Sequence, residues 1–474
     1  MKSLKKIPRY FKLLGLLCLI ISLVVFQPPN LFALNQNEEI ELGQKVHSQL
    51  AAQSVFFDDP IVNEYFQKIC QRLMKAVGKQ PYPYTFTIVN SNFLNAFAVP
   101  GGFIYLHTET INSLENEGQL AAILAHEIAH ITSRHFARRS DSSRSNTLLS
   151  LAGLLVGIAL STSGGSGGQN TAALGQAILM GTTGASIQAM LANSRADETE
   201  ADTKGRNYMI KAGYNPRDMY GAFKIMNEQS YPFTANIPGY LSTHPGLAAR
   251  LASSFADQQA APAAPFDASY QHIKDRVLAL TAQPNRAMTL FAKRLAENPN
   301  DDSALHALGL IAMREMSYSQ AEDFFKKALS LSATSAEYLS DFGELDLKRR
   351  RPEEAAAHFQ AARKNGLTNM QTAVGLARSY ELIGRIKDAS DLYEQIAKSP
   401  SAAYPVALEL AGRFFGQHGQ LAKGHFLLAT FFEATGKPKD AIFHCQAAVK
   451  DPQGYNYRKK CEQKERDLTA LNED

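Results

Sequence analysis

The sequence predicts a mainly α-helical protein, in which an α+β domain with a small sheet is followed by an α-solenoid. The first observation behind this prediction is a repeat of 34 residues in the second half of the chain. The second is a strand-turn-strand pattern in the first half, close to a helix rich in Ala and Leu. With 474 residues, the chain also exceeds what one hydrophobic core usually organises. We therefore expect at least two domains.

The repeat is carried by small and aromatic residues at helical spacing. The matching positions, 34 residues apart, are Ala321 and Ala355, Phe325 and Phe359, and Ala328 and Ala362. This period and composition are typical of tetratricopeptide repeats, whose paired helices stack into a superhelix. The register slips after Ala389, and an additional helix around 404–417 accounts for most of the gap. A plain helical bundle is the alternative.

The N-terminus has the architecture of a signal peptide. Five positive charges precede a nearly unbroken apolar run over 13–26, and a Pro28-Pro29 break leads to Ala33. The run is shorter than the roughly 20 residues that a spanning helix needs, so we expect export, with an uncleaved anchor as the alternative. Subtracting the five charges from the formal net charge of +4 leaves −1. That balance argues against nucleic acid as a partner.

Export changes how the cysteines are interpreted, because disulfides persist outside the reducing cytosol. Cys70, Cys445 and Cys461 would remain after cleavage of the signal peptide. Cys445 and Cys461 are the pair favoured for a bridge, since they could join two adjacent C-terminal helices. Three buried, reduced thiols are the alternative.

An Ala/Pro-rich stretch over 258–265 separates the two halves and indicates a linker or a domain edge. The expected organisation is a signal peptide over 1–33, a first domain over 34–260, a connecting segment over 261–284 and a repeat domain over 285–474.

The chemistry is expected in the first half, where residues 120–132 predict a buried helix because they lack Gly and Pro. His126 and His130 lie four residues apart on one face of that helix, so both imidazoles can reach a single metal ion. Glu127 points in a neighbouring direction and can hold a water molecule. This H-E-x-x-H pattern is typical of zinc peptidases. Two histidines satisfied in a helix interface would give the same pattern.

A second helical segment offers the third ligand that a catalytic zinc site needs. Glu198 and Asp202 lie four residues apart in the acidic run over 194–202. If Glu198 binds the metal, Asp202 can accept a hydrogen bond from a ligating imidazole and so fix its tautomer. Alone, this run would be a solvated helix surface.

Four stretches of the sequence jointly resemble a known family. They are His126-Glu127-Ile-Ala-His130, Arg195-x-x-Glu198-x-x-Ala201-Asp202, the Asn95 to Tyr105 stretch with its Pro-Gly-Gly turn, and His244-Pro245 followed by Arg250. They resemble the gluzincin proteases of the HtpX, Oma-type and CAAX-prenyl-protease superfamily. The whole chain is similar to the BepA-like branch, in which tetratricopeptide repeats follow the protease domain.

The resemblance implies one zinc ion per chain, with His126, His130 and Glu198 as ligands. It further implies that Glu127 is the general base and that Asp202 supports a ligating imidazole. Proteolysis would then need no Ser or Cys nucleophile.

The resemblance also places His244 and Arg250 near the metal, where they would position or stabilise the substrate or occlude the zinc at rest. His244 lies in a segment with loop signals. Two roles stay open, because a neutral imidazole can be a fourth ligand whereas a donating one can stabilise the oxyanion. We favour the fourth ligand, which would guard an exported protease.

The Asn95 to Tyr105 stretch alternates around Pro100-Gly101-Gly102 and predicts a β-hairpin. Its edge could receive an extended peptide by strand addition. The residues expected to form this substrate edge are Asn95, Ala96, Phe97 and Ala98. An ordinary hairpin would have the same pattern.

Two apolar segments, 148–160 and 172–190, flank a Gly/Ser-rich connection. In membrane-bound relatives this region spans the bilayer. Here the first segment is short for a span. We expect a helical hairpin that covers the site or makes peripheral contact with a membrane surface.

Together these features predict a periplasmic zinc endopeptidase that degrades or processes misfolded or stalled envelope and outer-membrane proteins. The repeats would recruit clients and contact the outer-membrane assembly machinery. Two alternatives stay open: a non-catalytic tetratricopeptide chaperone or adaptor, and an integral-membrane zinc protease.

Overall fold

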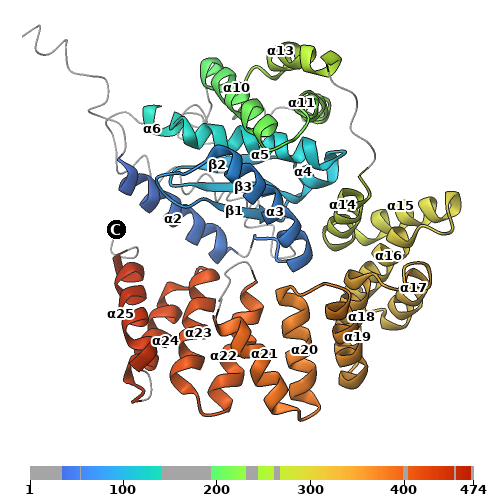
Figure 1. The fold of residues 1–474 in the computed structure, drawn as a ribbon, viewed down its shortest axis with the longest axis vertical. Helices are drawn as coiled ribbons and strands as arrows, with labels where there is room; N and C mark the ends of the chain where they lie inside the picture. Colours follow the sequence, from blue (N-terminus) through green and yellow to red (C-terminus); the bar gives the residue numbers. More distant parts are fainter. Residues whose placement is uncertain are drawn as a thin grey trace, which may run out of the picture.

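A computed structural model describes residues 35–53, 55–139, 194–230, 244–260, 267–398, 404–452 and 455–470. The signal peptide expected over 1–33 and the apolar segments expected over 148–160 and 172–190 lie outside these residues. The predicted mainly α fold with a small sheet is confirmed (Figure 1). Within the described ranges, no helix combines the length and apolarity needed to cross a membrane.

The N-terminal part consists of helices around a three-stranded sheet. Its helices are α2 (Gln36–Ala52), α3 (Pro60–Val77), α4 (Thr108–Ser113), α5 (Glu117–Thr132), α6 (His135–Arg139), α10 (Arg195–Lys211), α11 (Arg217–Ser230) and α13 (Leu247–Ala260). Its strands are β1 (Thr85–Val89), β2 (Ala96–Val99) and β3 (Phe103–His107). The strand order is β1-β3-β2, with β1 parallel and β2 antiparallel to β3. The β2–β3 hairpin is therefore present where the sequence predicts it.

The two faces of the sheet carry different layers. Ala96 and Ile104 share one core with α3 and α5, whereas Phe97 and Tyr105 share another with α2. This alternation follows from the two-residue period of a strand. Successive side chains of β2 point to opposite faces, and Ala96 lies on the face toward α5. Its small side chain leaves room for α5 to pack closely on the strand.

Helix α5 is buried on all sides. The side chain of Asn116 caps its N-terminus by accepting a hydrogen bond from the amide of Gln119 at 2.8 Å. Every residue from Gly118 to Ile131 is buried, which explains why this stretch is apolar all round. Within this buried stretch of α5, the charged or titratable side chains are His126, Glu127 and His130 of the H-E-x-x-H pattern.

The second half is a row of helices of the tetratricopeptide type. They are α14 (Ala268–Thr281), α15 (Pro284–Glu297), α16 (Asp302–Arg314), α17 (Tyr318–Leu331), α18 (Ala336–Lys348), α19 (Pro352–Lys364), α20 (Met370–Leu382), α21 (Ile386–Lys398), α22 (Pro405–Gln417), α23 (Leu421–Ala434), α24 (Pro438–Lys450) and α25 (Tyr455–Ala470). Consecutive helices pack in pairs, and Phe325 and Phe359 are fully buried between them. A Cβ added at Gly309 would overlap the Phe325 ring, so the repeat needs a small residue there.

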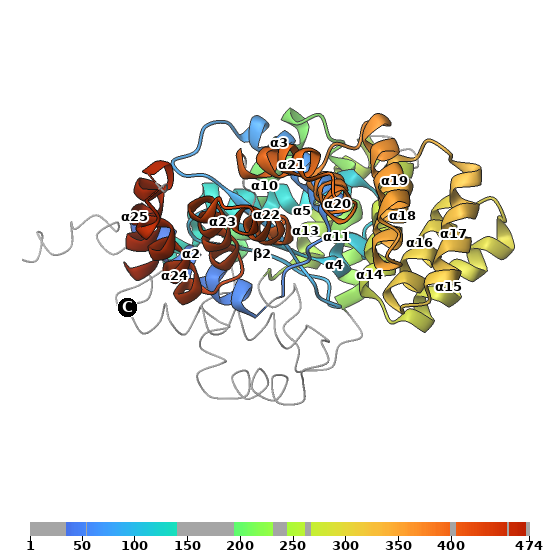
Figure 2. The ribbon, with the colours of Figure 1, turned by 90° about the horizontal axis from the view of Figure 1, so that it is seen from below.

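The row of repeats runs along one side of the N-terminal part (Figures 1 and 2). The segment 261–284, predicted as a connection, contains α14, which packs on both halves of the chain. Tyr270 of α14 donates a hydrogen bond to the carbonyl of Ile111 at 2.9 Å, and Lys274 donates to the carbonyl of Leu114. Helix α14 is therefore a shared structural element.

Arg276 of α14 joins the two halves through a buried ionic contact. It donates two hydrogen bonds of 2.8 Å to Asp59, whose carboxylate also caps α3, and it forms an ion pair with Asp341 of α18. His306 of α16 contacts the same Asp341 at 2.9 Å. Burial alone would raise the pKa of Asp341, but Arg276 and His306 hold it well below its usual value. Arg276 and His306 together therefore favour the ionised form of Asp341.

The far end of the row also reaches the N-terminal part. Gly436, in the turn between α23 and α24, approaches α2 so closely that a Cβ would overlap the backbone of Ala52. The repeats therefore contact the N-terminal part near both of their ends.

We expect Arg276→Met to lower the free energy of unfolding by about 3 kcal/mol or more, because it leaves two buried carboxylates without their cation. Urea unfolding followed by circular dichroism measures this. Arg413→Met is the matched control, since Arg413 is 64% exposed and, among the described residues, forms an ion pair only with Glu409 on its own helix; its cost should be below about 0.5 kcal/mol. Equal costs for the two variants would contradict the assigned role.

Candidate metal centre

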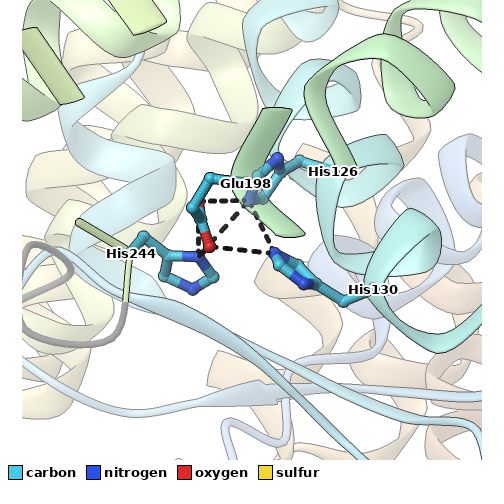
Figure 3. A group of neighbouring side chains, drawn as sticks. All are labelled: His126, His130, Glu198 and His244. Atoms are coloured by element: carbon cyan, nitrogen blue, oxygen red, sulfur yellow. Dashed lines mark hydrogen bonds and ion pairs between the residues drawn. The ribbon is translucent and has the colours of Figure 1, made fainter. Parts of the chain in front are cut away.

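Four side chains from three segments converge beside α5 (Figure 3). His126 and His130 come from α5, Glu198 comes from α10, and His244 directly precedes α13. All four are buried, with exposed fractions between 0% and 7%. Two histidines that merely filled a helix interface would not require a buried carboxylate and a third imidazole beside them.

The donor atoms of this cluster are spaced as ligands of one ion. His126 Nε2 lies 3.0 Å from His130 Nε2 and 3.4 Å from Glu198 Oε2. His244 Nδ1 lies 3.2 Å from Glu198 Oε1. Two ligand atoms at about 2.1 Å from a tetrahedral ion are about 3.4 Å apart. The nitrogen and oxygen donors therefore fit a zinc ion in number, type and spacing.

Asp202 and Arg250 surround the cluster on its outer side. Asp202 lies one turn after Glu198 on α10, and its carboxylate accepts from His126 Nδ1 at 2.9 Å. That contact leaves Nε2 of His126 directed at the other donors. Arg250 of α13 donates two hydrogen bonds of 2.8 Å to Asp202 and pairs with Glu198 at 2.6 Å. Both carboxylates are thereby held in place.

The electrostatics of the cluster keep its carboxylate ionised. Burial alone would raise the pKa of Glu198, but His244 and His126 hold it well below its usual range. Burial and Arg250 lower the pKa of His126, yet Asp202 and Glu198 outweigh them and raise it to about 9. Because ligands must be deprotonated, a metal ion would displace a proton from this cluster on binding.

Glu127 lies next to the cluster but not in it. Its side chain is 1% exposed, and neither carboxylate oxygen has a hydrogen-bond partner in the described part of the chain. The nearest basic atom is His244 Nε2, 3.5 Å from Oε1. A buried carboxylate without a donor is costly unless a ligand or water completes it. This group is therefore available to a molecule bound at the metal.

His135 contacts His130, and the sequence interpretation did not predict this contact. Its Nδ1 lies 2.7 Å from Nδ1 of His130, and its Nε2 lies 3.2 Å from Glu200. His130 is therefore supported from outside the cluster, as His126 is. Its support is indirect, because the His135 imidazole contacts His130 and the Glu200 carboxylate contacts His135. The signal was present in the sequence as a histidine five residues after His130, but only the fold brings Glu200 to it.

Close packing of α10 on α5 carries Glu198 to the two histidines. A Cβ added at Gly205 would lie 3.0 Å from the backbone nitrogen of His126, which is tighter than ordinary packing. Lys204 donates to the hydroxyl of Ser133 at 2.9 Å, one turn beyond His130. The two helices are therefore fixed in register along the length that holds the donors.

The predicted substrate edge lies at the border of the sheet. β2 begins at Ala96, and within the described residues no strand pairs with its outer side. Ala96 and Ala98 face the core that contains α5, whereas Phe97 packs toward α2. Asn95 precedes the strand, is buried, and has no partner for its amide oxygen among the described residues. A role of this edge in binding substrate stays a prediction.

Comparison with known proteins places this site in a family. The "Beta-barrel assembly-enhancing protease" of Escherichia coli O157:H7 is 27% identical over 364 residues, which cover 76% of this chain and 73% of the relative. The "Mitochondrial metalloendopeptidase OMA1" of Schizosaccharomyces pombe is 26% identical over 187 residues, covering 40% and 50%. The crystal structure of PilW, a widely conserved type IV pilus biogenesis factor, is 19% identical with a TM-score of 0.33, covering 41% of this chain and 93% of that one.

The fold, the donor cluster and these relatives define a metalloprotease. Residues 60–254 match Peptidase family M48. This part of the chain is an M48 peptidase domain, and zinc is the metal that such peptidases use. The matched range contains the whole donor cluster and Arg250. The non-catalytic adaptor considered from the sequence is thereby set aside.

We expect Asp202→Asn to weaken zinc binding by about 10- to 100-fold, because an amide cannot replace the carboxylate that accepts from His126 and pairs with Arg250. Competition with a chromophoric zinc chelator at fixed pH measures the affinity. Asp388→Asn is the control, since Asp388 is 44% exposed on α21 and its ion pair, with Arg385, lies at the surface. If Asp202→Asn binds zinc as tightly as the unmodified chain, Asp202 does not support a ligand.

Proposed function

We propose that this metalloprotease is an endopeptidase of the bacterial cell envelope that cleaves misfolded or stalled outer-membrane proteins, which its repeats recruit. The observation that carries the catalytic part is Glu127, which is buried beside a cluster of zinc-type donors and has no hydrogen-bond partner in the part of the chain that the structure describes. The client class is supported by the name of the Escherichia coli relative, a protease that enhances β-barrel assembly.

His126, His130 and Glu198 would hold the zinc ion, and Asp202 would keep His126 in the tautomer that presents Nε2. When bound, zinc polarises the scissile carbonyl and lowers the pKa of the attacking water. The cluster is nearly closed to solvent, so charges within it interact more strongly than they would in water.

Glu127 would act as the general base and then as the general acid. Its carboxylate takes the proton of the attacking water and afterwards delivers it to the leaving amine. The absence of a hydrogen-bond donor to Glu127 among the described residues supports this role, because a donor would compete with the water for the carboxylate. Two outer elements would complete the site: Arg250, which fixes Glu198 and Asp202, and β2, which would receive the substrate as an added strand.

His244 would be the fourth ligand at rest. Its Nδ1 lies 3.3 Å from His126 Nε2 and 3.2 Å from Glu198 Oε1, which is a ligand's position in the cluster rather than a place beside it. A ligand there would block the open position that catalysis needs. The short segment Pro245-Gly246 behind it, with Gly246 at a φ of 78°, connects His244 to α13.

The central test is Glu127→Gln, which we expect to bind near-stoichiometric zinc while casein cleavage falls by about 100-fold or more. Zinc is measured by mass spectrometry and cleavage by release of soluble peptides. Glu64→Gln is the control, because Glu64 is 42% exposed and forms a surface ion pair with Lys68 one turn further along α3. Cleavage by Glu127→Gln at the rate of the control would rule out the catalytic assignment.

His244→Ala separates the two roles of His244. As a resting ligand, its loss should raise basal proteolysis and self-cleavage with zinc occupancy almost unchanged. As an oxyanion donor, its loss should lower kcat with little change in KM. His418→Ala, at an exposed histidine of the repeats, is the control. Unchanged basal proteolysis, self-cleavage and kcat in His244→Ala would remove both roles.

The repeats are tested by deleting the chain from Asn285 onward. We expect zinc binding and cleavage of a short peptide to persist, because α14 with its contacts to Ile111 and Leu114 is retained. Processing of an unfolded outer-membrane β-barrel protein should fall several-fold, since stacked repeats offer an extended surface for partners. Undiminished processing would remove the recruitment role. An insoluble truncation would indicate that the repeats support folding instead.

A further inference from the structure

The last helix of the repeats has a weak apolar anchor. α25 spans Tyr455–Ala470, yet among its described side chains only Cys461 and Leu468 are buried. The remaining described side chains are largely charged, such as the exposed Lys459 and Lys460, and Tyr457 packs against the repeat core only in part. Terminal helices with little buried apolar surface open readily. A covalent link to the neighbouring helix would therefore stabilise α25.

Two buried cysteines lie on the helices α24 and α25, which pack side by side (Figure 1). Cys445 of α24 and Cys461 of α25 are both fully buried and belong to one core cluster. Both carry free thiols in the structure, and they are hydrogen-bonded to each other. One residue further along α24, Gln446 donates to Glu465 of α25 at 2.7 Å, so the two helices are in register here.

We propose that Cys445 and Cys461 are oxidised to an intramolecular disulfide that pins α25 to α24. The two cysteines lie on neighbouring helices that pack against each other, so a covalent link would join segments already in contact. Cys70 is not a competitor, because it is buried in the separate core of the N-terminal part. The predicted signal peptide would send the chain to a compartment where disulfides persist.

The chemistry is thiol–disulfide exchange with a small disulfide or a disulfide oxidase. The hydrogen bond from Cys445 lowers the pKa of Cys461, and the nearby Lys464 acts in the same direction. The Cys461 thiolate attacks one sulfur of the oxidant and expels its first thiolate, giving a mixed disulfide. Cys445, as thiolate, then attacks Cys461 and expels the second. The protein loses two electrons and two protons, and the oxidant becomes two thiols.

This link would also stabilise the contact between the repeats and the N-terminal part. A cavity between α2 and the C-terminal helices is lined by Lys45, Ser48 and Glu433, and by Asp467 and Leu468 of α25. On the same side, the turn at Gly436 touches α2. Holding α25 on α24 therefore keeps one wall of this junction in place.

The test is peptide mapping of the full chain after incubation with glutathione disulfide and unfolding in the presence of an alkylating agent. We expect a peptide pair joined through Cys445 and Cys461 that disappears on reduction, while Cys70 is alkylated in both samples. Cys445 and Cys461 alkylated singly, joined to Cys70 or carrying glutathione would overturn the proposal. Cys461→Ser should abolish the joined pair.

The role of the link is measured by amide hydrogen exchange on oxidised and reduced samples of the same chain, so that no variant has to fold. Amides of α25 should exchange about tenfold or more faster after reduction, whereas those of α18, far from the link, should not change. Equal exchange of α25 in both samples would show that no disulfide holds this helix.

Discussion

Burying a charged, metal-binding cluster is the constraint on which the N-terminal part depends. Imidazoles and carboxylates lose the stabilisation of water when they are enclosed, so each needs a partner inside the protein. Arg250 compensates the charges of Glu198 and Asp202 together. His135 gives the imidazole of His130 a hydrogen-bond partner. The close approach of α10 to α5 at Gly205 follows from the same need. Glu127, by contrast, has no hydrogen-bond partner among the described residues, and His244 Nε2 lies 3.5 Å from its Oε1.

The junction of the two halves solves a similar problem with different groups. Arg276 is enclosed between Asp59 and Asp341, which belong to segments far apart in the sequence. An arginine suits this place because its planar guanidinium can donate to two carboxylates at once. Since α14 carries Arg276 and packs on α4 and α16, the repeats and the peptidase domain are held at a defined position relative to each other.

The sequence was sufficient to predict the features that depend on a local pattern of residues. The 34-residue spacing predicted the repeats, the Pro-Gly-Gly turn predicted the hairpin, and the spacing of His126 and His130 predicted two donors on one helix face. It could not predict contacts that depend on tertiary approach, such as His135 with Glu200 or Arg276 with Asp341. The helix α14 within 261–284 was also missed, because the Ala/Pro-rich stretch before it suggested a linker.

The central claim is that the four converging side chains hold one zinc ion. X-ray diffraction at the zinc absorption edge from crystals of the full chain tests it most directly. The account predicts one anomalous peak about 2.0–2.1 Å from ligand atoms of His126, His130 and Glu198, with His244 as the fourth ligand at rest. A peak elsewhere, or none in zinc-loaded protein that cleaves casein, would contradict it.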